Sequence, residues 1–309
     1  MRWLDPLGAL SQVGVEGTGI FGAGLCRFLV GRGVAVIEVE RPYRRTRRQQ
    51  GKSDPIDAEA AARAVLAGTA TASPKNRDGI VESIRVLRTT RSGAVRSRTA
   101  AINALHALVI TAPDGLRCLL EPFGPAALVK TCTRFRPDTT RPAEVCQATK
   151  LAMRELARRV ERFDSEIRDL DRVLVPLVRT AAPNTIALLG IGPDHAAQFL
   201  ITAGGNPARL RSEAAFAHLC GASPIPASSG RTQRHRLHRG GDRSANRALH
   251  LAIVVRLRYC ERTRAYVQRR TRDGLSKPEI IRCLKRYLAR EIFHTISQDL
   301  DQLNRLDGL

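Results

Sequence analysis

The sequence lacks the features of a membrane or exported protein. No uninterrupted apolar run approaches the roughly 18 residues that a membrane span needs. The first residues, MRWLDPLGAL, place Asp5 where a signal peptide has its apolar stretch. We therefore expect a cytoplasmic protein that has no membrane partner.

Cysteine pairs and aromatic arrays are also missing. The seven cysteines are scattered without a CxxC pair, which argues against a disulfide scaffold and a zinc module and predicts reduced, structural thiols. The single tryptophan and four tyrosines form no stacking array of the kind found in single-strand binders.

Acidic residues are few compared with basic ones. The chain has 29 Asp and Glu against 51 Lys and Arg, which gives a formal net charge of +22. Six of the basic residues are lysine, so 45 are arginine. A surplus of this size usually pairs with the phosphates of nucleic acid, which arginine binds in a bidentate way. Codon bias explains the choice of arginine but not the surplus, so the composition predicts nucleic-acid binding.

The first 75 residues predict an α/β arrangement. Gln12–Glu16 and Val34–Val39 are typical of strands, Ile20–Val30 fits a helix, and another helix begins near Asp54. This βαβα order implies a parallel sheet, although two strands are too few for a complete one.

The remainder of the 309-residue chain predicts an all-α arrangement. We expect helices over 80–109, 144–178, 211–219, 243–269 and 277–303, irregular pieces over 111–140, and a long loop over 221–242. Apolar residues between Leu156 and Leu174 alternate in steps of four and three, which is typical of a coiled coil or helical hairpin. This pattern fits packing within one chain and pairing between chains equally well. The predicted domains are 1–75, a helical connector over 76–182, and a mainly helical domain over 183–309.

Three acidic residues form the first candidate site. Glu16 ends a predicted strand, where parallel sheets usually place their ligands. Asp54 and Asp57 are three residues apart, so a helix presents both carboxylates on one side. Carboxylate oxygens suit Mg²⁺. The alternative is helix capping, with Asp54 as the N-cap, Pro55 at the first helical position and Asp57 at the third.

A serine-bearing basic loop forms the second candidate site. In PIPASSGRTQRHRLHRGGDR, Ser228 and Ser229 stand among basic residues that suit phosphate: Arg231, Arg234, Arg236, Arg239 and Arg243. Guanidinium groups bind a phosphate and neutralise its charge as a hydroxyl attacks. The alternative is a loop that only binds nucleic acid. Gly190 and Gly192, in LGIGP, predict either a helix-hairpin-helix-like contact with phosphate or a simple turn.

Three stretches together resemble the transposases of the IS110/IS1111 family. They are VGVEGTGIFG, KSDPIDAEAAARA, and the segment from LLGIGPDHAAQFL to DRSANRAL, and the resemblance spans about residues 12–295. It implies a RuvC/RNase H-like DEDD domain in which Glu16, Asp54 and Asp57 bind Mg²⁺. It also implies a C-terminal domain whose serine bonds covalently to DNA, matched here by Ser229 with Ser228 as its neighbour.

The resemblance further implies double-stranded DNA, a structured guide RNA, and a homo-oligomer, dimer or tetramer, whose active sites are shared between subunits. We expect such a protein to associate with the bacterial nucleoid. The family's first aspartate belongs some tens of residues before the glutamate, whereas fifteen residues precede Glu16 and Asp5 has the wrong context. The sequence thus predicts an N-terminally truncated chain with an incomplete RuvC-like domain and little or no activity by itself.

We predict a DNA transposase that cuts and rejoins DNA through a serine nucleophile and Mg²⁺-binding carboxylates. One alternative is a remnant that binds nucleic acid without catalysis. A second alternative is a Mg²⁺-dependent RuvC-like nuclease that uses the carboxylates alone.

Overall fold

A computed structural model describes residues 10–39, 53–206, 209–231 and 235–307. They form two compact units, one that combines Met1–Ser83 with Val178–Leu309 and one made of Ile84–Leu177. The second unit occupies most of the predicted connector, 76–182. Among the described helices, none is both long enough and apolar enough to cross a bilayer.

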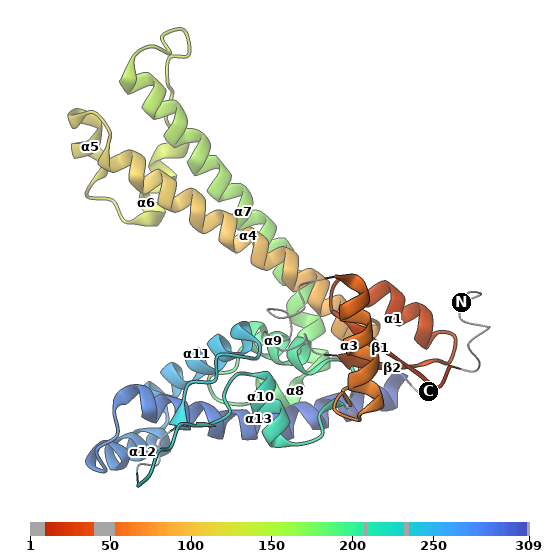
Figure 1. Cartoon of the computed structure of the whole chain (residues 1–309). Coiled ribbons are helices and arrows are strands. Elements are labelled where there is room, and N and C mark those ends of the chain that lie inside the picture. Colours follow the sequence, from red (N-terminus) through yellow and green to blue (C-terminus); the bar gives the residue numbers. More distant parts are fainter. Residues whose placement is uncertain (1–9, 40–52, 207–208, 232–234, 308–309) are drawn as a thin grey trace. The chain divides into compact units, whose positions relative to one another are not determined.

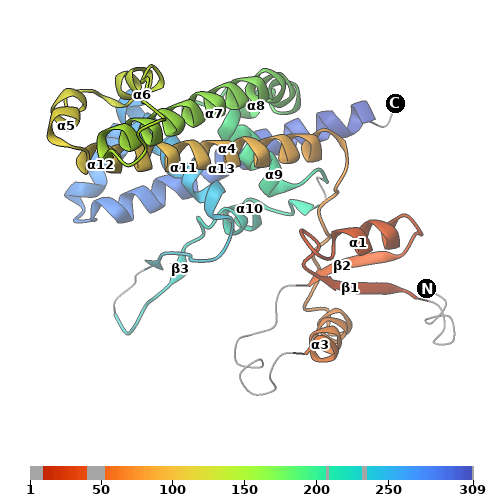
Figure 2. The same cartoon turned by 90° about the horizontal axis from the view of Figure 1, so that it is seen from above.

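The first unit contains a small parallel sheet with a helix on each face. Strands β1 (Gln12–Glu16) and β2 (Ala35–Val39) pair in parallel, from Gln12 opposite Ala35 to Glu16 opposite Val39. Helix α1 (Ala23–Val30) covers one face and α3 (Asp54–Leu66) covers the other (Figure 2). The predicted βαβα order and parallel sheet are confirmed.

Alternate strand residues build the two small cores of this sheet. One core contains Val15, Cys26, Leu29 and Val36, and the other contains Val39, Ala61 and Val65. The helix expected from Ile20 begins at Ala23 instead, because a turn precedes it in which Ile20 N–H and Gly22 N–H both donate to Gly17 O.

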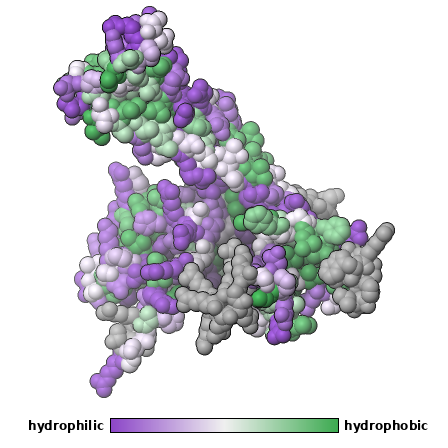
Figure 3. Space-filling view, turned by 45° about the horizontal axis from the view of Figure 1, so that its top comes forward, coloured by the Kyte–Doolittle hydropathy of each residue, from purple (hydrophilic) through white to green (hydrophobic). Residues whose placement is uncertain are grey.

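The outer side of α1 and the turn before it carry large apolar side chains. Phe21 is 98% exposed, and Ile20, Leu25 and Phe28 are exposed as well. The space-filling view shows hydrophobic residues gathered over this region, on the right side of the picture (Figure 3). Apolar surface of this extent is typical of contact sites rather than of solvated faces.

The second unit is built on two long helices, α4 (Gly79–Ile110) and α7 (Val145–Ala181), which run side by side (Figure 1). Two ion pairs join them, Arg91 Nε to Asp171 Oδ1 and Arg98 Nε to Asp164 Oδ1, both at 2.5 Å. Of the predicted seam, Val160 and Leu174 are buried, and the seam residues between them, Phe163, Ile167 and Leu170, are half-buried. The seam therefore packs partly within the chain, and pairing between chains stays a prediction.

Residues 111–140 are not irregular as predicted, because they contain α5 (Asp114–Leu120) and α6 (Pro125–Thr133). Two of the four prolines in this stretch stand at helix starts, where the missing N–H costs nothing: Pro113 is the N-cap of α5 and Pro125 opens α6. Both helices bury leucines and Cys132 against α4 and α7.

The C-terminal part of the first unit is helical. It contains α8 (Pro183–Ile186), α9 (Pro193–Ala203), α10 (Glu213–Leu219), α11 (Arg243–Tyr259), α12 (Glu261–Arg272) and α13 (Lys277–Asp307). Helix α13 buries an apolar residue every four positions from Ile280 to Leu300. The buried Asp299 carboxylate binds α13 to α8, since it accepts from the backbone and side chains of Asn184 and Thr185 at 2.6–3.0 Å.

One helix predicted over 243–269 is in fact two helices. Cys260 has extended backbone angles, φ −107° and ψ 112°, and is both the C-cap of α11 and the N-cap of α12. The apolar periodicity of the sequence continues across this one-residue break, so the pattern does not indicate where the first helix ends. The break turns α12 so that the Tyr266 ring meets the edge of Tyr287 on α13, with ring centroids 5.6 Å apart.

Candidate nucleic-acid interface

The three candidate carboxylates lie at the sheet and at the start of α3. Glu16 is the last residue of β1 and is half-buried. Asp54 and Asp57 are both in the first turn of α3, with Asp54 exposed and Asp57 half-buried. Two acidic residues at this position favour the helix through its dipole by about 0.3–1 kcal/mol each.

The predicted N-cap role of Asp54 is wrong. Ser53 is the N-cap, with φ −146° and ψ 153°, so Asp54 is the first residue of the helix and Pro55 the second. No side-chain cap hydrogen bond forms there. Capping therefore does not account for Asp54, although the favourable dipole position of both aspartates does hold.

The three carboxylates offer the oxygen ligands that a hard divalent cation prefers. The described residues, however, contain no group of three or more His, Cys, Asp or Glu side chains arranged to hold a metal ion. As placed in one chain, these residues fit a metal by their chemistry but not by their arrangement.

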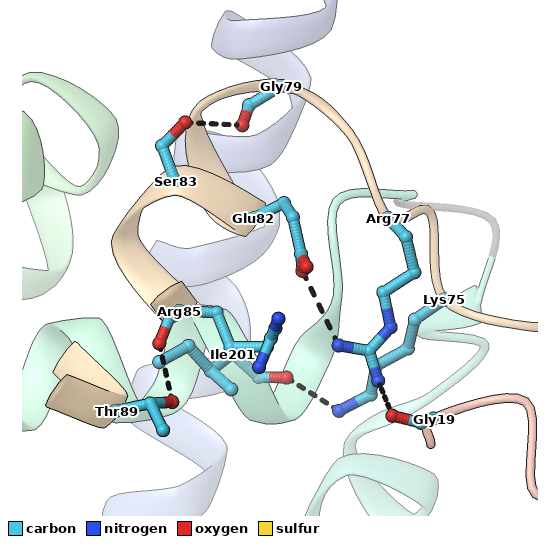
Figure 4. A network of polar contacts seen from close by, with 9 residues as sticks. All are labelled: Gly19, Lys75, Arg77, Gly79, Glu82, Ser83, Arg85, Thr89 and Ile201. Carbon is cyan, nitrogen blue, oxygen red and sulfur yellow. Dashed lines mark hydrogen bonds and ion pairs between the residues drawn. The ribbon is translucent and has the colours of Figure 1, made fainter. Parts of the chain in front are cut away.

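A polar network fixes the sheet to the helical part of the same unit (Figure 4). Lys75 Nζ donates to Ile201 O at 2.5 Å, and Arg77 donates to Gly19 O at 2.6 Å and to Glu82 at 3.4 Å. Burial, together with the nearby Arg209, lowers the pKa of Lys75 to about 8.

A second set of bonds continues this network along β2. Glu38 accepts from the Thr18 hydroxyl at 2.6 Å and from Arg209 Nη2 at 2.9 Å. Asn206 Nδ2 donates to Pro74 O, and Arg211 bonds to Thr71. The sheet that carries Glu16 is thus held to the helical part of the same unit by several hydrogen bonds.

The candidate serines lie on a loop between two very short strands. Strands β3 (Ile225–Pro226) and β4 (His235–Arg236) pair antiparallel, with Ile225 opposite Arg236. Ser228 and Ser229 are exposed, and Gly230 follows with φ +55°, a conformation that favours glycine. An exposed hydroxyl at a turn is accessible to a large substrate.

The base of this Ser229 loop is closely packed. Gly241 has φ +80°, and a Cβ there would lie 2.6 Å from Gly221 N and 2.7 Å from His218 O. Asn246 Nδ2 donates to Gly221 O at 2.8 Å, while its Oδ1 accepts from Lys285 Nζ at 2.9 Å. The two arms of the loop therefore leave the helical domain from a fixed crossing.

Asp242 anchors the end of the loop to two helices. One carboxylate oxygen caps α11 by accepting from Ser244 N at 2.8 Å and Ala245 N at 3.2 Å. The other oxygen accepts from Gln198 Nε2 and Thr202 Oγ1 of α9, both at 2.8 Å.

The basic residues around the loop are exposed. None of Arg231, Arg236, Arg239 and Arg243 forms an ion pair with a described residue, whereas Arg209 is paired with Glu38. Arg234 lies outside the described residues. Unpaired guanidinium groups bind phosphate without first breaking an internal ion pair.

The two candidate glycines differ in their surroundings. Gly190 has φ +87°, and a Cβ there would lie 2.8 Å from Ala252 O of α11. Gly192 is the N-cap of α9 with an ordinary φ of −95°, and nothing lies within 4 Å of its Cβ position. Close packing of the turn on α11 therefore explains Gly190 without a phosphate, and a phosphate contact at Gly192 stays a prediction.

Sequence reasoning missed α12 as part of the basic surface. This helix has five arginines in twelve residues (Arg262, Arg264, Arg269, Arg270 and Arg272), and Thr263 is its one buried residue. The signal was present in ERTRAYVQRRTR, a segment too polar for a core helix. A longer apolar pattern runs across this segment and predicts one continuous helix over 243–269 instead.

Family comparisons match both parts of the chain. A model described as the transposase IS116/IS110/IS902 family matches residues 186–268, and a model for the DEDD domain of IS110 transposases matches residues 3–112. Together they cover more than half of the chain. The chain belongs to the IS110 family of transposases.

The family models include the candidate residues of both sites. The DEDD model covers Glu16, Asp54 and Asp57, and the second model covers the Ser229 loop. A DEDD domain implies general dependence on a divalent metal.

A curated relative is the insertion element IS900 uncharacterized 42 kDa protein of Mycobacterium paratuberculosis. It is 30% identical over 148 residues, which make up 47% of this IS110-family chain. The matched stretch spans 37% of the length of the relative.

Proposed function

We propose that this IS110-family chain cuts and rejoins the DNA of an insertion sequence, with Ser229 as the nucleophile. The observation that carries the proposal is the exposed Ser229 on a loop whose described arginines form no ion pair with any other described residue. A loop of this kind attracts a phosphodiester and offers it a hydroxyl in the same place.

In the proposed step, Ser229 Oγ attacks the phosphorus of a DNA phosphodiester. A new Oγ–P bond forms, the bond from phosphorus to one deoxyribose oxygen breaks, and that oxygen gains the proton that the serine loses. The hydroxyl of another strand later attacks the phosphoserine, rejoining DNA and releasing Ser229. The neighbouring arginines balance the charge on the phosphate in both steps.

We propose that Glu16, Asp54 and Asp57 bind Mg²⁺ when DNA is present and position the strand. Within one chain, the sheet that carries Glu16 and the Ser229 loop lie in different regions of the first unit (Figures 1 and 2). This separation favours a homo-oligomer, dimer or tetramer, in which one subunit supplies the carboxylates and another the serine. The RuvC-like character of the sheet domain and the helix-hairpin-helix-like character of residues 183–203 belong to the same proposal.

The charge surplus of +22 exceeds what the Ser229 loop alone provides, which supports a second nucleic acid as partner. We propose that this second nucleic acid is a structured guide RNA and that the protein acts on the DNA of the nucleoid.

The test is the pair Ser229→Ala and Ser228→Ala, assayed for covalent protein–DNA adducts on denaturing gels. We expect Ser229→Ala to abolish adducts while DNA affinity is kept, and Ser228→Ala to retain adducts. Adducts that persist in Ser229→Ala and vanish in Ser228→Ala would move the role to Ser228. Adducts or cuts that need neither serine would reject the proposed nucleophile.

The two alternatives predict different results in the same assay. A remnant without catalysis binds DNA and forms no adducts even with both serines present. A nuclease that uses carboxylates alone cuts DNA in the presence of Mg²⁺ regardless of Ser229, and loses this activity in Asp54→Asn and Asp57→Asn.

A further inference from the structure

A cavity of about 620 Å³ lies between the arms of the Ser229 loop and helices α12 and α13. The arms contribute Gly221–Pro224 and His235–His238, and α13 contributes Arg282, Lys285 and Tyr287. The loop that holds the proposed nucleophile therefore also forms one wall of this open cavity.

The wall of this cavity carries more basic than acidic side chains. It contains four arginines and a lysine, as well as two histidines, against one acidic residue, Glu279. Glu279 accepts hydrogen bonds from the backbone N–H and hydroxyl of Ser276, at 3.0 and 2.6 Å. Three of the arginines are also ion-paired, Arg282 with Glu279 at 3.8 Å, Arg270 with Asp273 at 3.0 Å and Arg286 with Glu213 at 3.9 Å, whereas Arg236 forms no ion pair with a described residue. The wall still holds more positive than negative charge, which favours an anion.

Several of these groups are held away from water. Lys285 is 7% exposed, and its burial, with the neighbouring Arg282, lowers its pKa. His238 Nδ1 and Arg270 Nε are buried atoms for which no described residue supplies a hydrogen-bond partner. Buried polar atoms without hydrogen-bond partners are costly, and a bound ligand that reaches them removes this cost.

The cavity also has an apolar and aromatic side. Tyr287 is 52% exposed beside the Tyr266 ring, and Leu237 is 50% exposed on the opposite arm of the loop. A volume of 620 Å³ suits one small organic group rather than a base-paired duplex. The chemistry required is therefore an anion joined to a flat ring, as in a nucleotide that has left its helix.

We propose that this cavity binds one unpaired nucleotide of the DNA strand that Ser229 attacks, with its phosphate near Arg236 and Arg282 and its base beside Tyr287. The proposal rests on the function proposed above. DNA is favoured over RNA because the arms that line the cavity are those that carry the proposed nucleophile.

The test measures the affinity of the full chain for two DNA hairpins, identical except that one carries a single unpaired 2-aminopurine nucleotide in its stem. We expect tighter binding of the bulged hairpin and quenching of 2-aminopurine fluorescence on the protein. Arg282→Gln should reduce the preference for the bulge about tenfold, because it removes a charged hydrogen-bond donor. Arg305→Gln is the matched control, since it removes the same charge from an exposed site on the same helix.

Arg236→Gln, on the exposed loop, gives a second variant in case Arg282→Gln does not fold, and Tyr287→Leu should reduce the quenching alone. Equal loss for both hairpins, or no preference for the bulge in the unaltered chain, would overturn the proposal. Stronger binding of the same bulge in an RNA hairpin would also overturn it.

The two proposals fail separately. If Ser229→Ala removes adducts while the cavity variants keep the preference for the bulge, the cavity assignment is wrong and the nucleophile assignment stands. If adducts persist in Ser229→Ala while Arg282→Gln loses the preference for the bulge, the nucleophile assignment is wrong and the cavity assignment stands.

Discussion

Replacing Asp242 by alanine tests how the Ser229 loop is anchored. The Asp242 carboxylate caps α11 through Ser244 N and Ala245 N and also accepts hydrogen bonds from Gln198 and Thr202. Loss of an N-cap costs about 1 kcal/mol, and each hydrogen bond to a charged acceptor contributes about 1.5 kcal/mol or more. With allowance for partial replacement by neighbours, we expect Asp242→Ala to lower the free energy of unfolding by about 3 kcal/mol.

Two controls separate the cap from the buried bonds. Ser212→Ala removes a cap alone, the hydrogen bond that Ser212 Oγ accepts from Ala215 N at 3.2 Å, and should cost about 1 kcal/mol. Asp242→Asn keeps a good capping oxygen but places an amide donor opposite the Gln198 amide, so its effect should fall between the two.

Urea unfolding followed by circular dichroism measures these differences, and hydrogen exchange at the first turn of α11 localises them. Because the loop leaves from this anchor, adduct formation should fall more in Asp242→Ala than in Ser212→Ala. A free-energy loss in Asp242→Ala no larger than that in Ser212→Ala would refute the view that the carboxylate joins α9 to α11.

Three further predictions follow from single contacts. Burial lowers the pKa of Lys75 from 10.5 to about 8, so the unfolded chain binds this proton more tightly than the folded chain does. The free energy of unfolding should therefore rise between about pH 8 and 10.5. A urea titration across this range should find a smaller rise in Lys75→Met. Gly190→Ala should lower stability by about 2 kcal/mol or more through its positive φ and contact with α11, measured against the milder Gly192→Ala in thermal melts. Asp171→Ala, which breaks the half-exposed pair with Arg91, should cost about 1 kcal/mol or less in urea unfolding, and a larger loss would mean that the pair acts as a buried one.

Elements with a strong local signal could be predicted from the sequence. The β-branched run before Val39 and the strand that ends at Glu16 gave the parallel pair, because alternate side chains enter the cores under α1 and α3. The long helices α4 and α7 followed from their apolar spacing. Features decided by single residues were missed, such as the extended Cys260 between α11 and α12 and the helix starts at Pro113 and Pro125.

The candidate site likewise has some features that the sequence predicts and others that it does not. The motif residues Glu16, Asp54, Asp57 and Ser229 could be named from sequence, since they lie in short recognisable stretches. The cavity beside the Ser229 loop could not, because it forms where residues 221–224, 235–238 and 270–287 meet, and no local pattern reports such a meeting. Lys285 reads in sequence as one more surface cation, yet it is buried and bonded to Asn246.

The arginine surplus has two separable roles in this structure. Arg91, Arg98 and Arg209 are paired with carboxylates and hold helices or the sheet in place. The described arginines of the Ser229 loop have no such partner within the part of the chain that the structure describes. Raising the salt concentration screens exposed charges and weakens DNA binding steeply. In a plot of the logarithm of the binding constant against the logarithm of the salt concentration, each contacted phosphate steepens the slope by about 0.9. Neutralising Arg236 or Arg239 should therefore reduce this slope without changing stability, whereas neutralising Arg209 should lower stability and leave the slope unchanged.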